Sequence, residues 1–432
     1  MKAGVARRLI NPPLGIILMG YDRSKGNTGV HDDLTATALV LEDGGKKVAI
    51  ITLDMVGLSD FVVNRIRSCL VPVEAMLCCS HTHSGPIAHA DEKSSCLNRE
   101  YIDFLIEQIG AAVYEAASNT GPVSITYSNG ELDLALNRRR EMPDGSIKTG
   151  PYPKDVVDRS IQVLSVINED GERVAMLINY ACHGTVLGPK NLLASADWIG
   201  AMRSKVENQL GGHVLFLQGA AGNINPPSAW GNKPYERLEK IGSKVAEAVI
   251  DAVHDDSEEV HDLNLQLERE ETWLPTEIEV RTRKYPKAYR KPLIKSINLP
   301  GWMSFRTDPI LNKLLPYKPR VEARDGFWSV PLRINTLRIG DLALITFSGE
   351  LFTELGLTIK QNSPARHTLV VSITDGFVAY LPTRRAHAQG GYEIEAAPYL
   401  LRFPGRFAAN CEDIVLDAAQ TALDGLWNAP PS

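Results

Sequence analysis

Short runs of β-branched and apolar residues, separated by turn signals, recur along the chain and predict a protein rich in β-sheet. The clearest case is residues 35–58, TATALVLEDGGKKVAIITLDMVGL, where two such runs flank an Asp-Gly-Gly cluster. This pattern predicts a β-hairpin, because Gly readily adopts the left-handed backbone of tight hairpin turns. Further strands are predicted at 74–83, 123–130, 160–168, 173–183, 212–219, 332–350 and 367–376.

Helical periodicity is clearest over residues 99–120. Apolar side chains recur there at spacings of three and four, as one face of an amphipathic helix requires: Tyr101, Phe104, Leu105, Ile109 and Val113. Other helices are predicted after Asp197, which is suited to cap a first turn, and at 234–255 and 410–427. Hairpins mixed with strand–helix units indicate an α/β fold with mixed β-sheets flanked by helices.

Composition narrows the class of protein. The chain has 432 residues, 44% of them hydrophobic, and a formal net charge of -6, which gives no reason to expect nucleic acid as a partner. No run reaches the roughly 20 apolar residues of a transmembrane helix, and the apolar stretch near the N-terminus is short for a secretion signal. A cytoplasmic location is expected, because the six cysteines form no pairing motif and resemble reduced core residues. They are Cys69, Cys78, Cys79, Cys96, Cys182 and Cys411.

Residues 281–320 differ in composition from the rest of the chain. They contain eleven Lys or Arg residues and one acidic residue, Asp308. We expect an insert or cap, for which two interpretations are open. The segment is either a charged excursion that faces water or a second copy of the chain, or a lid whose positive field attracts an anionic substrate or a membrane surface.

Histidines at the ends of apolar runs are the main candidates for chemistry. Residues i and i+2 of a strand project to the same side, so His81 and His83 in CCSHTHSGP are expected to face one space. His183 ends a second apolar run, and ligand sites in α/β proteins gather at such strand ends. Glu350 ends a third run, where a carboxylate must be exposed, paired or bound to a metal. The four side chains therefore predict a metal or substrate site.

Rival hydrolase and nucleotide-binding families fit less well. HTHSGP lacks the Asp and the last His of the metallo-β-lactamase motif, and the hairpin-rich beginning does not fit the amidohydrolase barrels. HExxH, Walker A and GxSxG motifs are absent.

A Gly-rich turn in FLQGAAGNINPP, residues 216–227, is of the kind that presents backbone N–H groups to an oxyanion or phosphate.

Taken together, these segments resemble the catalytic domain of the neutral/alkaline, non-lysosomal ceramidase family. The matching motifs are MGYDR, GVHDDLTATALVLEDGGKKVAIITLDMVGLS, SHTHSGP, LNRRR, NYACHGT, FLQGAAGNINP, FSGELFTELG and GFVAYLPTRRAHAQGGYE, in the family's order. They cover most of residues 15–250 and 330–410. The resemblance implies a single ceramidase-like catalytic domain over residues 1–432, without the C-terminal immunoglobulin-like domain of longer members.

The resemblance also implies an activity. It is that of a zinc-dependent hydrolase of a linear amide, in which a zinc-activated water attacks the acyl carbonyl of a small or lipid-like N-acyl compound. One Zn2+ per chain would be held by His81, His183, Glu350 and Tyr380. His83 would exchange protons with the water and the leaving amine, and Arg138 and Tyr392 would hydrogen-bond to the acyl oxygen. Asp54 and Asp197 are candidates to accept imidazole N–H groups, or else cap and turn residues.

One departure from the family pattern limits the mechanism. The family's Gly-rich turn commonly reads GDxSP, whereas Asn223 and Asn225 stand here in place of the Asp and Ser. A serine nucleophile at this turn is therefore excluded. Two alternatives stay open: hydrolysis of an ester or lactone on the same metal, since the pocket alone selects the carbonyl compound, and a non-catalytic metal-binding homologue. The sequence also leaves open a homo-oligomer.

Overall fold

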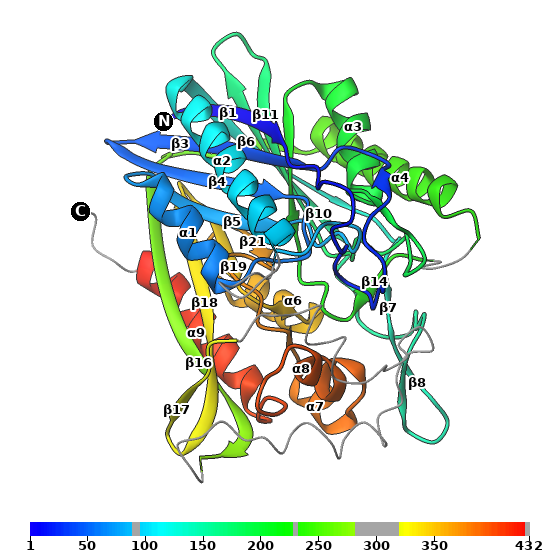
Figure 1. Ribbon diagram of the computed structural model, residues 1–432. Coiled ribbons are helices and arrows are strands. Elements are labelled where there is room, and N and C mark those ends of the chain that lie inside the picture. Colours follow the sequence, from blue (N-terminus) through cyan, green and yellow to red (C-terminus); the bar gives the residue numbers. More distant parts are fainter. Residues whose placement is uncertain (89–95, 228–231, 281–318, 428–432) are drawn as a thin grey trace.

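The computed structural model describes residues 1–88, 96–227, 232–280 and 319–427. Two β-sheets lie face to face between two layers of helices (Figure 1). The predicted α/β fold with mixed sheets and flanking helices is therefore confirmed. Almost all of the basic segment 281–320 lies outside the described residues.

The first sheet is mixed and contains the predicted hairpin. In spatial order its strands are β13 (His213–Gln218), β11 (Arg173–Tyr180), β10 (Ser160–Asn168), β6 (Gly121–Glu131), β1 (Lys2–Leu9), β3 (Thr35–Asp43), β4 (Lys46–Leu53) and β5 (Glu74–Cys79), and β15 (Ser257–Glu259) pairs with β6. β3 and β4 are antiparallel and join through Gly44 and Gly45, which both have positive φ. β5 is parallel to β4, and β13 is parallel to β11.

The second sheet is smaller, and all of its strands come from the C-terminal half of the chain. Its strands are β16 (Leu265–Glu279), β18 (Phe327–Ile339), β19 (Leu342–Phe347) and β21 (His367–Val371), and β17 (Glu322–Arg324) pairs with β18. Short pairs join loops: β2 (Gly29–Val30) with β12 (Leu193–Ala194), β7 (Leu136–Asn137) with β14 (Ile224–Asn225), β8 (Arg139–Glu141) with β9 (Ile147–Thr149), and β20 (Glu350–Leu351) with β22 (Tyr380–Leu381).

Helices cover the outer face of each sheet. On the first sheet these are α1 (Asp60–Leu70), α2 (Cys96–Ser118), α3 (Trp198–Leu210) and α4 (Pro234–Asp255). On the second they are α6 (Thr353–Asn362) and α9 (Cys411–Trp427), and near the site lie α7 (Arg384–Gln389), the π-helical turn Tyr392–Ala396 and α8 (Ala397–Leu400). Within the described residues, no helix has both the length and the apolar character needed to cross a bilayer.

Burial on both faces explains why the strands read as nearly continuous apolar runs. In β3, Ala38 and Val40 pack against α1 and α2, whereas Leu39 and Leu41 point into the core between the sheets. Leu344 of β19 is one of the residues that the second sheet contributes to that same core. The two sheets therefore share one dry interior, and their relative position is fixed by side-chain packing.

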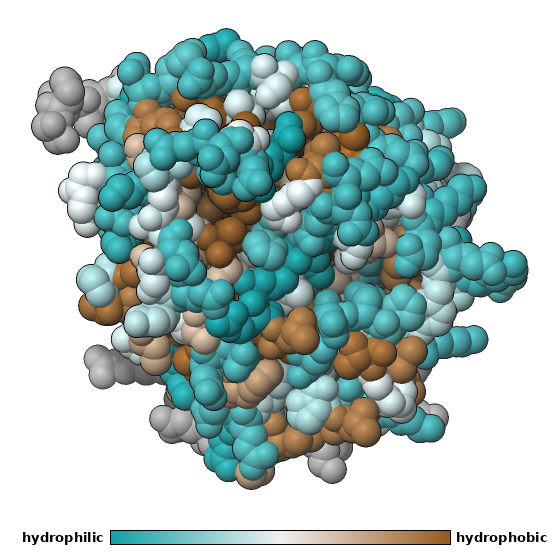
Figure 2. All heavy atoms as spheres, turned by 90° about the horizontal axis from the view of Figure 1, so that it is seen from above, coloured by the Kyte–Doolittle hydropathy of each residue, from teal (hydrophilic) through white to brown (hydrophobic). Residues whose placement is uncertain are grey.

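Two expectations about individual residues need correction. Phe104 was placed on the apolar face of α2, yet it is 37% exposed, whereas Tyr101 and Leu105 are buried. All six cysteines are unpaired, as expected, but only four are buried, because Cys69 and Cys96 lie at the surface. On the face seen from above in Figure 2, hydrophilic residues predominate and hydrophobic ones form separate patches.

Candidate metal and active site

The candidate site lies at the carboxyl ends of strands from both sheets. The loop after β5 carries two histidines, the loop after β11 carries one, and β20 follows β19 after a short turn. The first two loops pair directly: His83 N donates to Gly184 O at 2.9 Å, and Thr82 forms an isolated β-bridge with Gly184. This pairing brings together histidines that lie a hundred residues apart in the sequence.

His81 and His83 do converge, but not through strand alternation. β5 ends at Cys79, so both residues lie in the following loop, and the expected placement on a strand is wrong. His81 has a left-handed backbone with φ of 61°, which costs an L-residue about 1–2 kcal/mol. Hydrogen bonds hold this conformation, since His81 N donates to Met55 O at 2.9 Å and Thr82 Oγ1 donates to Ser195 O at 2.7 Å.

Three imidazoles and a carboxylate meet at one point. The candidate ligand nitrogens of His81, His83 and His183 all lie within 4.8 Å of one another, and His81 Nε2 is 3.4 Å from His83 Nε2. Glu350 Oε2 lies 3.3 Å from His81 Nε2 and 3.2 Å from His183 Nε2. Glu350 is 4% exposed, so its carboxylate is buried, and the expectation that remains is a partner or a metal.

Backbone carbonyl groups determine the proton positions on two of these rings. His81 Nδ1 lies 2.7 Å from Val56 O, and His183 Nδ1 lies 2.9 Å from Ile224 O. A carbonyl oxygen only accepts, so each Nδ1 carries a proton, and in a ring without a second proton the lone pair of Nε2 points at Glu350. Two lone pairs and a carboxylate oxygen about 3.2 Å apart repel one another unless a cation or a proton lies between them.

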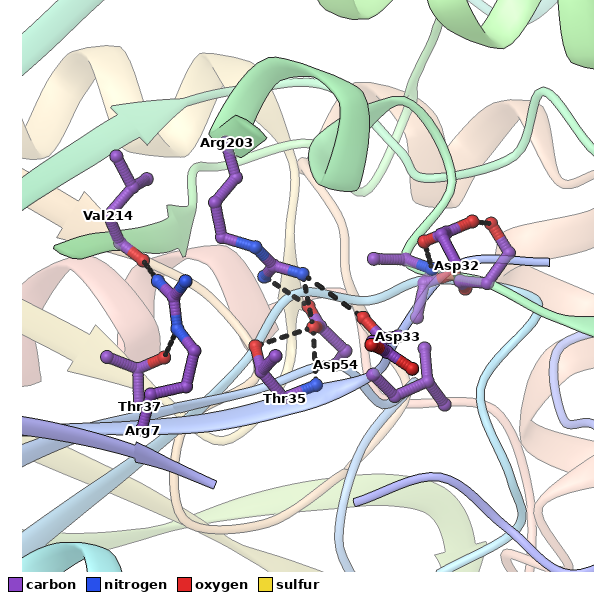
Figure 3. A network of polar contacts seen from close by, with 12 residues as sticks. Arg7, Asp32, Asp33, Thr35, Thr37, Asp54, Arg203 and Val214 are labelled. Atoms are coloured by element: carbon purple, nitrogen blue, oxygen red, sulfur yellow. Dashed lines mark hydrogen bonds and ion pairs between the residues drawn. The ribbon is translucent and has the colours of Figure 1, made fainter. Parts of the chain in front are cut away.

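This donor set fits a zinc ion. Zinc binds imidazole nitrogen and carboxylate oxygen, and zinc-bound histidines usually donate their other N–H to a backbone carbonyl or a carboxylate. Of the two roles left open for Asp54 and Asp197, that of imidazole acceptor is wrong for both, and the cap role is confirmed for Asp197 at the start of α3. Asp54 accepts from Thr35 and Arg203 (Figure 3), and Asp197 accepts from the backbone N–H groups of residues 186, 187 and 198 at the start of α3.

Tyr380 lies directly beside Glu350. The parallel pair formed by β20 and β22 places Glu350 opposite Tyr380 in register, and the ring of Tyr380 is 5.2 Å from the guanidinium carbon of Arg138. Burial and the nearby Glu350 carboxylate raise the pKa of the Tyr380 hydroxyl well above its usual value. Tyr392, half-buried on the π-helical turn, has its ring 5.8 Å from that of Tyr380.

Arg138 lies against both Tyr380 and the histidine cluster. Its Nη1 is 3.3 Å from His183 Nε2 and 3.2 Å from Asn225 Oδ1, and its Nη2 donates to Gly222 O at 2.7 Å. Burial and the positive charge of Arg138 lower the pKa of His183 to about 4. The His183 imidazole is therefore neutral at neutral pH, consistent with the lone pair assigned to Nε2.

The Gly-rich turn plays a different part from the one predicted. Its Gly219 and Gly222 N–H groups donate to Tyr180 O and Leu351 O, so neither is free to bind an anion. Asn223 accepts from Thr353 N at 2.9 Å, and Asn225 accepts from Arg138. The two asparagines therefore fasten the turn to α6 and orient Arg138.

His83 differs from the other two histidines. Its Nδ1 is buried and has no hydrogen-bond partner among the described residues, and the ring packs edge-on against Tyr21 at 5.0 Å. Burial, together with the neighbouring His81 and His183, lowers the pKa of His83 well below its usual value. The sequence carries no signal that Tyr21, in the motif MGYDR, contacts a histidine.

Comparisons with known proteins identify the family. Residues 3–224, just over half of the chain, match the family model for the N-terminal domain of neutral/alkaline non-lysosomal ceramidase. Neutral ceramidase 1 from Arabidopsis thaliana is 27% identical over 217 residues, covering 46% of this chain and 28% of that protein. Neutral ceramidase from Pseudomonas aeruginosa is 27% identical over 231 residues, covering 48% of this chain and 34% of that protein. The matched region thus spans about a third of each relative.

Solved structures agree at the level of the fold. The whole chain superposes on 76% of a ceramidase complexed with C2, with a TM-score of 0.74 and 17% identity. It also superposes on 75% of the crystal structure of neutral ceramidase from Pseudomonas aeruginosa, with a TM-score of 0.73 and 17% identity. The chain belongs to the neutral/alkaline non-lysosomal ceramidase family.

Proposed function

We propose that the protein is a zinc-dependent hydrolase of a linear amide bond in an N-acyl compound. The observation that carries the proposal is the meeting of His81, His183 and Glu350, with both Nδ1 atoms bonded to carbonyls and both Nε2 lone pairs directed at one carboxylate oxygen. Membership of the ceramidase family supports an amide as the substrate, and the relatives that match are neutral ceramidases.

His81, His183 and Glu350 would hold one zinc ion per chain, and the register of β20 with β22 makes Tyr380 the candidate fourth ligand. Zinc, when bound, supplies Lewis-acid polarisation of the acyl carbonyl and lowers the pKa of a bound water to about 7. The other donors of the site then act on the substrate.

Arg138 is suited to bind the acyl oxygen. Its Nη1 points at His183 Nε2, the atom whose lone pair a metal would take, so this donor is left for an oxygen of the substrate. Tyr392, next to Tyr380, would provide a second hydrogen bond. Both donors stabilise negative charge as it forms on the acyl oxygen.

His83 would move the protons. Its Nε2 faces the same centre as His81 Nε2, and it would accept a proton from the attacking water and return it to the leaving amine. Because His83 also lies within ligand distance of the cluster, metal content separates the two roles. If the His83→Ala variant keeps zinc but loses turnover, His83 is a base. If the variant loses zinc, His83 is a ligand.

The decisive experiment combines metal analysis with a substrate panel. The purified protein should contain about one zinc per chain, and His81→Ala should lose it. The wild-type protein should hydrolyse N-acyl amines, lose activity with a chelator and regain it with added zinc. Turnover restricted to matched esters or lactones would overturn the amide assignment, and full zinc occupancy without any turnover would identify a binding protein.

We also propose a cytoplasmic location. The absence of disulfides among the six cysteines supports a cytoplasmic protein. A small-molecule or lipid-like N-acyl substrate fits the family, and a homo-oligomer is tested by measuring the mass in solution.

A further inference from the structure

A buried carboxylate next to Tyr392 joins two neighbouring arginines. Glu393 lies on the π-helical turn and is 2% exposed. Its Oε1 accepts from Arg138 Nε at 2.9 Å, and its Oε2 accepts from Arg139 Nη1 at 2.7 Å. Each oxygen thus holds one guanidinium, and such charge-assisted bonds are stronger and more directional than neutral ones.

Glu393 is one of the acceptors that orient Arg138. The Nε of Arg138 is bonded to Glu393, its Nη2 to Gly222 O, and its Nη1 to Asn225 Oδ1. These three anchors leave Nη1 directed at His183 Nε2. Because Gly222 and Asn225 belong to one turn, Glu393 is the anchor that fixes the guanidinium from the other side.

Arg139 in turn fixes the segment that carries Glu393. Its Nη2 donates to Gly390 O at 2.8 Å and to Ala386 O at 3.3 Å, so it closes the end of α7. Gly390 and Gly391 enter the π-helical turn with φ of 71° and 96°, which L-residues rarely adopt. π-helical turns of this kind are frequent at functional sites, where they redirect a side chain.

We propose that Glu393 is a positioning residue that holds Arg138 against the acyl oxygen of the substrate. This inference rests on the proposed function. Two guanidiniums and one carboxylate leave a single positive charge beside the reacting carbonyl, where negative charge develops. Arg138 is thereby kept in place before the substrate arrives, which is what makes an oxyanion-stabilising donor effective.

The direct test is Glu393→Gln. The amide keeps the size of the side chain but removes its negative charge and one of its two acceptors, so the link from Arg138 through Glu393 to Arg139 is broken. We expect kcat on an N-acyl amine to fall about 10- to 100-fold, with KM changed less than about 3-fold and zinc content unchanged. Glu393→Asp, which keeps the charge, should recover part of kcat.

Asp158→Asn is the matched control. Asp158 is also a buried carboxylate with a cationic partner, Lys360, but neither touches the site. It should lower thermal stability while leaving kcat and KM unchanged. An equal loss of kcat in both variants, or an unchanged kcat in Glu393→Gln, would overturn the positioning role.

A double-mutant cycle isolates the partner through which Glu393 acts. In an Arg138→Ala background, Glu393→Gln should cause no further loss of kcat, because the group that it positions is gone. Losses that multiply would show that Glu393 acts through something other than Arg138.

A measurement on zinc-free protein makes the two proposals separable. With arginine labelled by 15N, the Nε–H signal of Arg138, assigned with Arg138→Lys, should exchange slowly in wild type and much faster in Glu393→Gln. Slow exchange in both would overturn the positioning role. If wild type and Glu393→Gln differ in this exchange rate but wild type never hydrolyses an amide, the positioning role is supported and the proposed function is refuted.

Discussion

Gly20 packs against the ring of His83. A Cβ atom at this position would lie 2.4 Å from His83 Cγ, and the backbone has φ of 100°, which favours Gly. The adjoining Tyr21 packs edge-on against His83, and Arg23 lies over the Tyr21 ring at 4.9 Å and donates to Leu18 O at 3.0 Å. The N-terminal segment therefore fixes the position of the histidine that we propose as the base.

The substitution Gly20→Ala should displace His83 and reduce turnover. We expect kcat to fall at least about 10-fold while zinc stays bound, because the other candidate ligands are untouched. Steady-state kinetics and metal analysis on the same preparation check this. Gly110→Ala in α2 is the control: a Cβ meets nothing within 4 Å there, so activity should be kept. Wild-type kcat in Gly20→Ala would refute the packing argument.

Residue identities alone could indicate the candidate ligands but not the groups that orient them. His81, His183 and Glu350 stand at the ends of apolar runs, and the structure brings these three together. The proposed partners Asp54 and Asp197 were chosen because carboxylates often orient zinc-binding imidazoles. Backbone carbonyls perform that task here, and any residue type supplies a carbonyl, so no sequence signal exists for it.

At the level of elements, Asp158 and Lys360 join β10 to α6. Asp158 Oδ2 accepts from Lys360 Nζ at 2.8 Å, and Oδ1 accepts from Ser160 N at 3.0 Å. Burial favours the neutral acid, but the charge and hydrogen bond of Lys360 and the bonds from Ser160 outweigh it, so the pKa of Asp158 lies below its usual value.

A lowered carboxyl pKa gives stability that depends on pH. The contribution of Asp158 is fully present above the usual Asp pKa of about 3.9 and is lost as pH falls through the lower value of the folded state. Asp158→Asn should thus lower the free energy of unfolding by about 1–3 kcal/mol at pH 7, and this difference should shrink below pH 4. Urea unfolding at several pH values measures it.

An exposed pair provides the comparison. Asp133 and Arg159 form a surface ion pair, and Asp133→Asn should change the free energy of unfolding by less than about 1 kcal/mol at any pH. A difference between wild type and Asp158→Asn that stays constant from pH 7 to pH 3 would contradict the role given to the charge.

Elements with strong periodicity were predictable, and others were not. The helix predicted at 234–255 is confirmed as α4, and the hairpin at 35–58 as β3 and β4. The long strand β16 was missed because many of its residues face solvent and it carries no buried alternation. The π-helical turn was also missed, and its Glu393 bonds to arginines more than 250 residues away in sequence, which no local pattern records.

At the scale of the whole molecule, the site spans the two sheets. The loops after β5 and β11 of the first sheet carry the three histidines, and Arg138 lies between β7 and β8. Glu350 and Tyr380 lie on the separate pair β20 and β22, which follow β19 and β21 of the second sheet along the chain. Strand patterns predicted both sheets, but not that they pack face to face, because that packing depends on side chains far apart in sequence, such as Leu39 and Leu344. Only the family resemblance placed Tyr380 in the same site as the histidines.

Because a metal at this site would tie the two sheets together, its removal should destabilise the entire protein. A ligand that binds only the folded state adds about 4 kcal/mol of stability at a thousand-fold excess over its Kd. A chelator should therefore lower the Tm of wild type by several degrees, and added zinc should restore it. His183→Ala should have the lower Tm already and show no response, whereas His254→Ala, exposed at the end of α4, should respond as wild type does. Equal responses in His183→Ala and wild type would place the stabilising metal elsewhere.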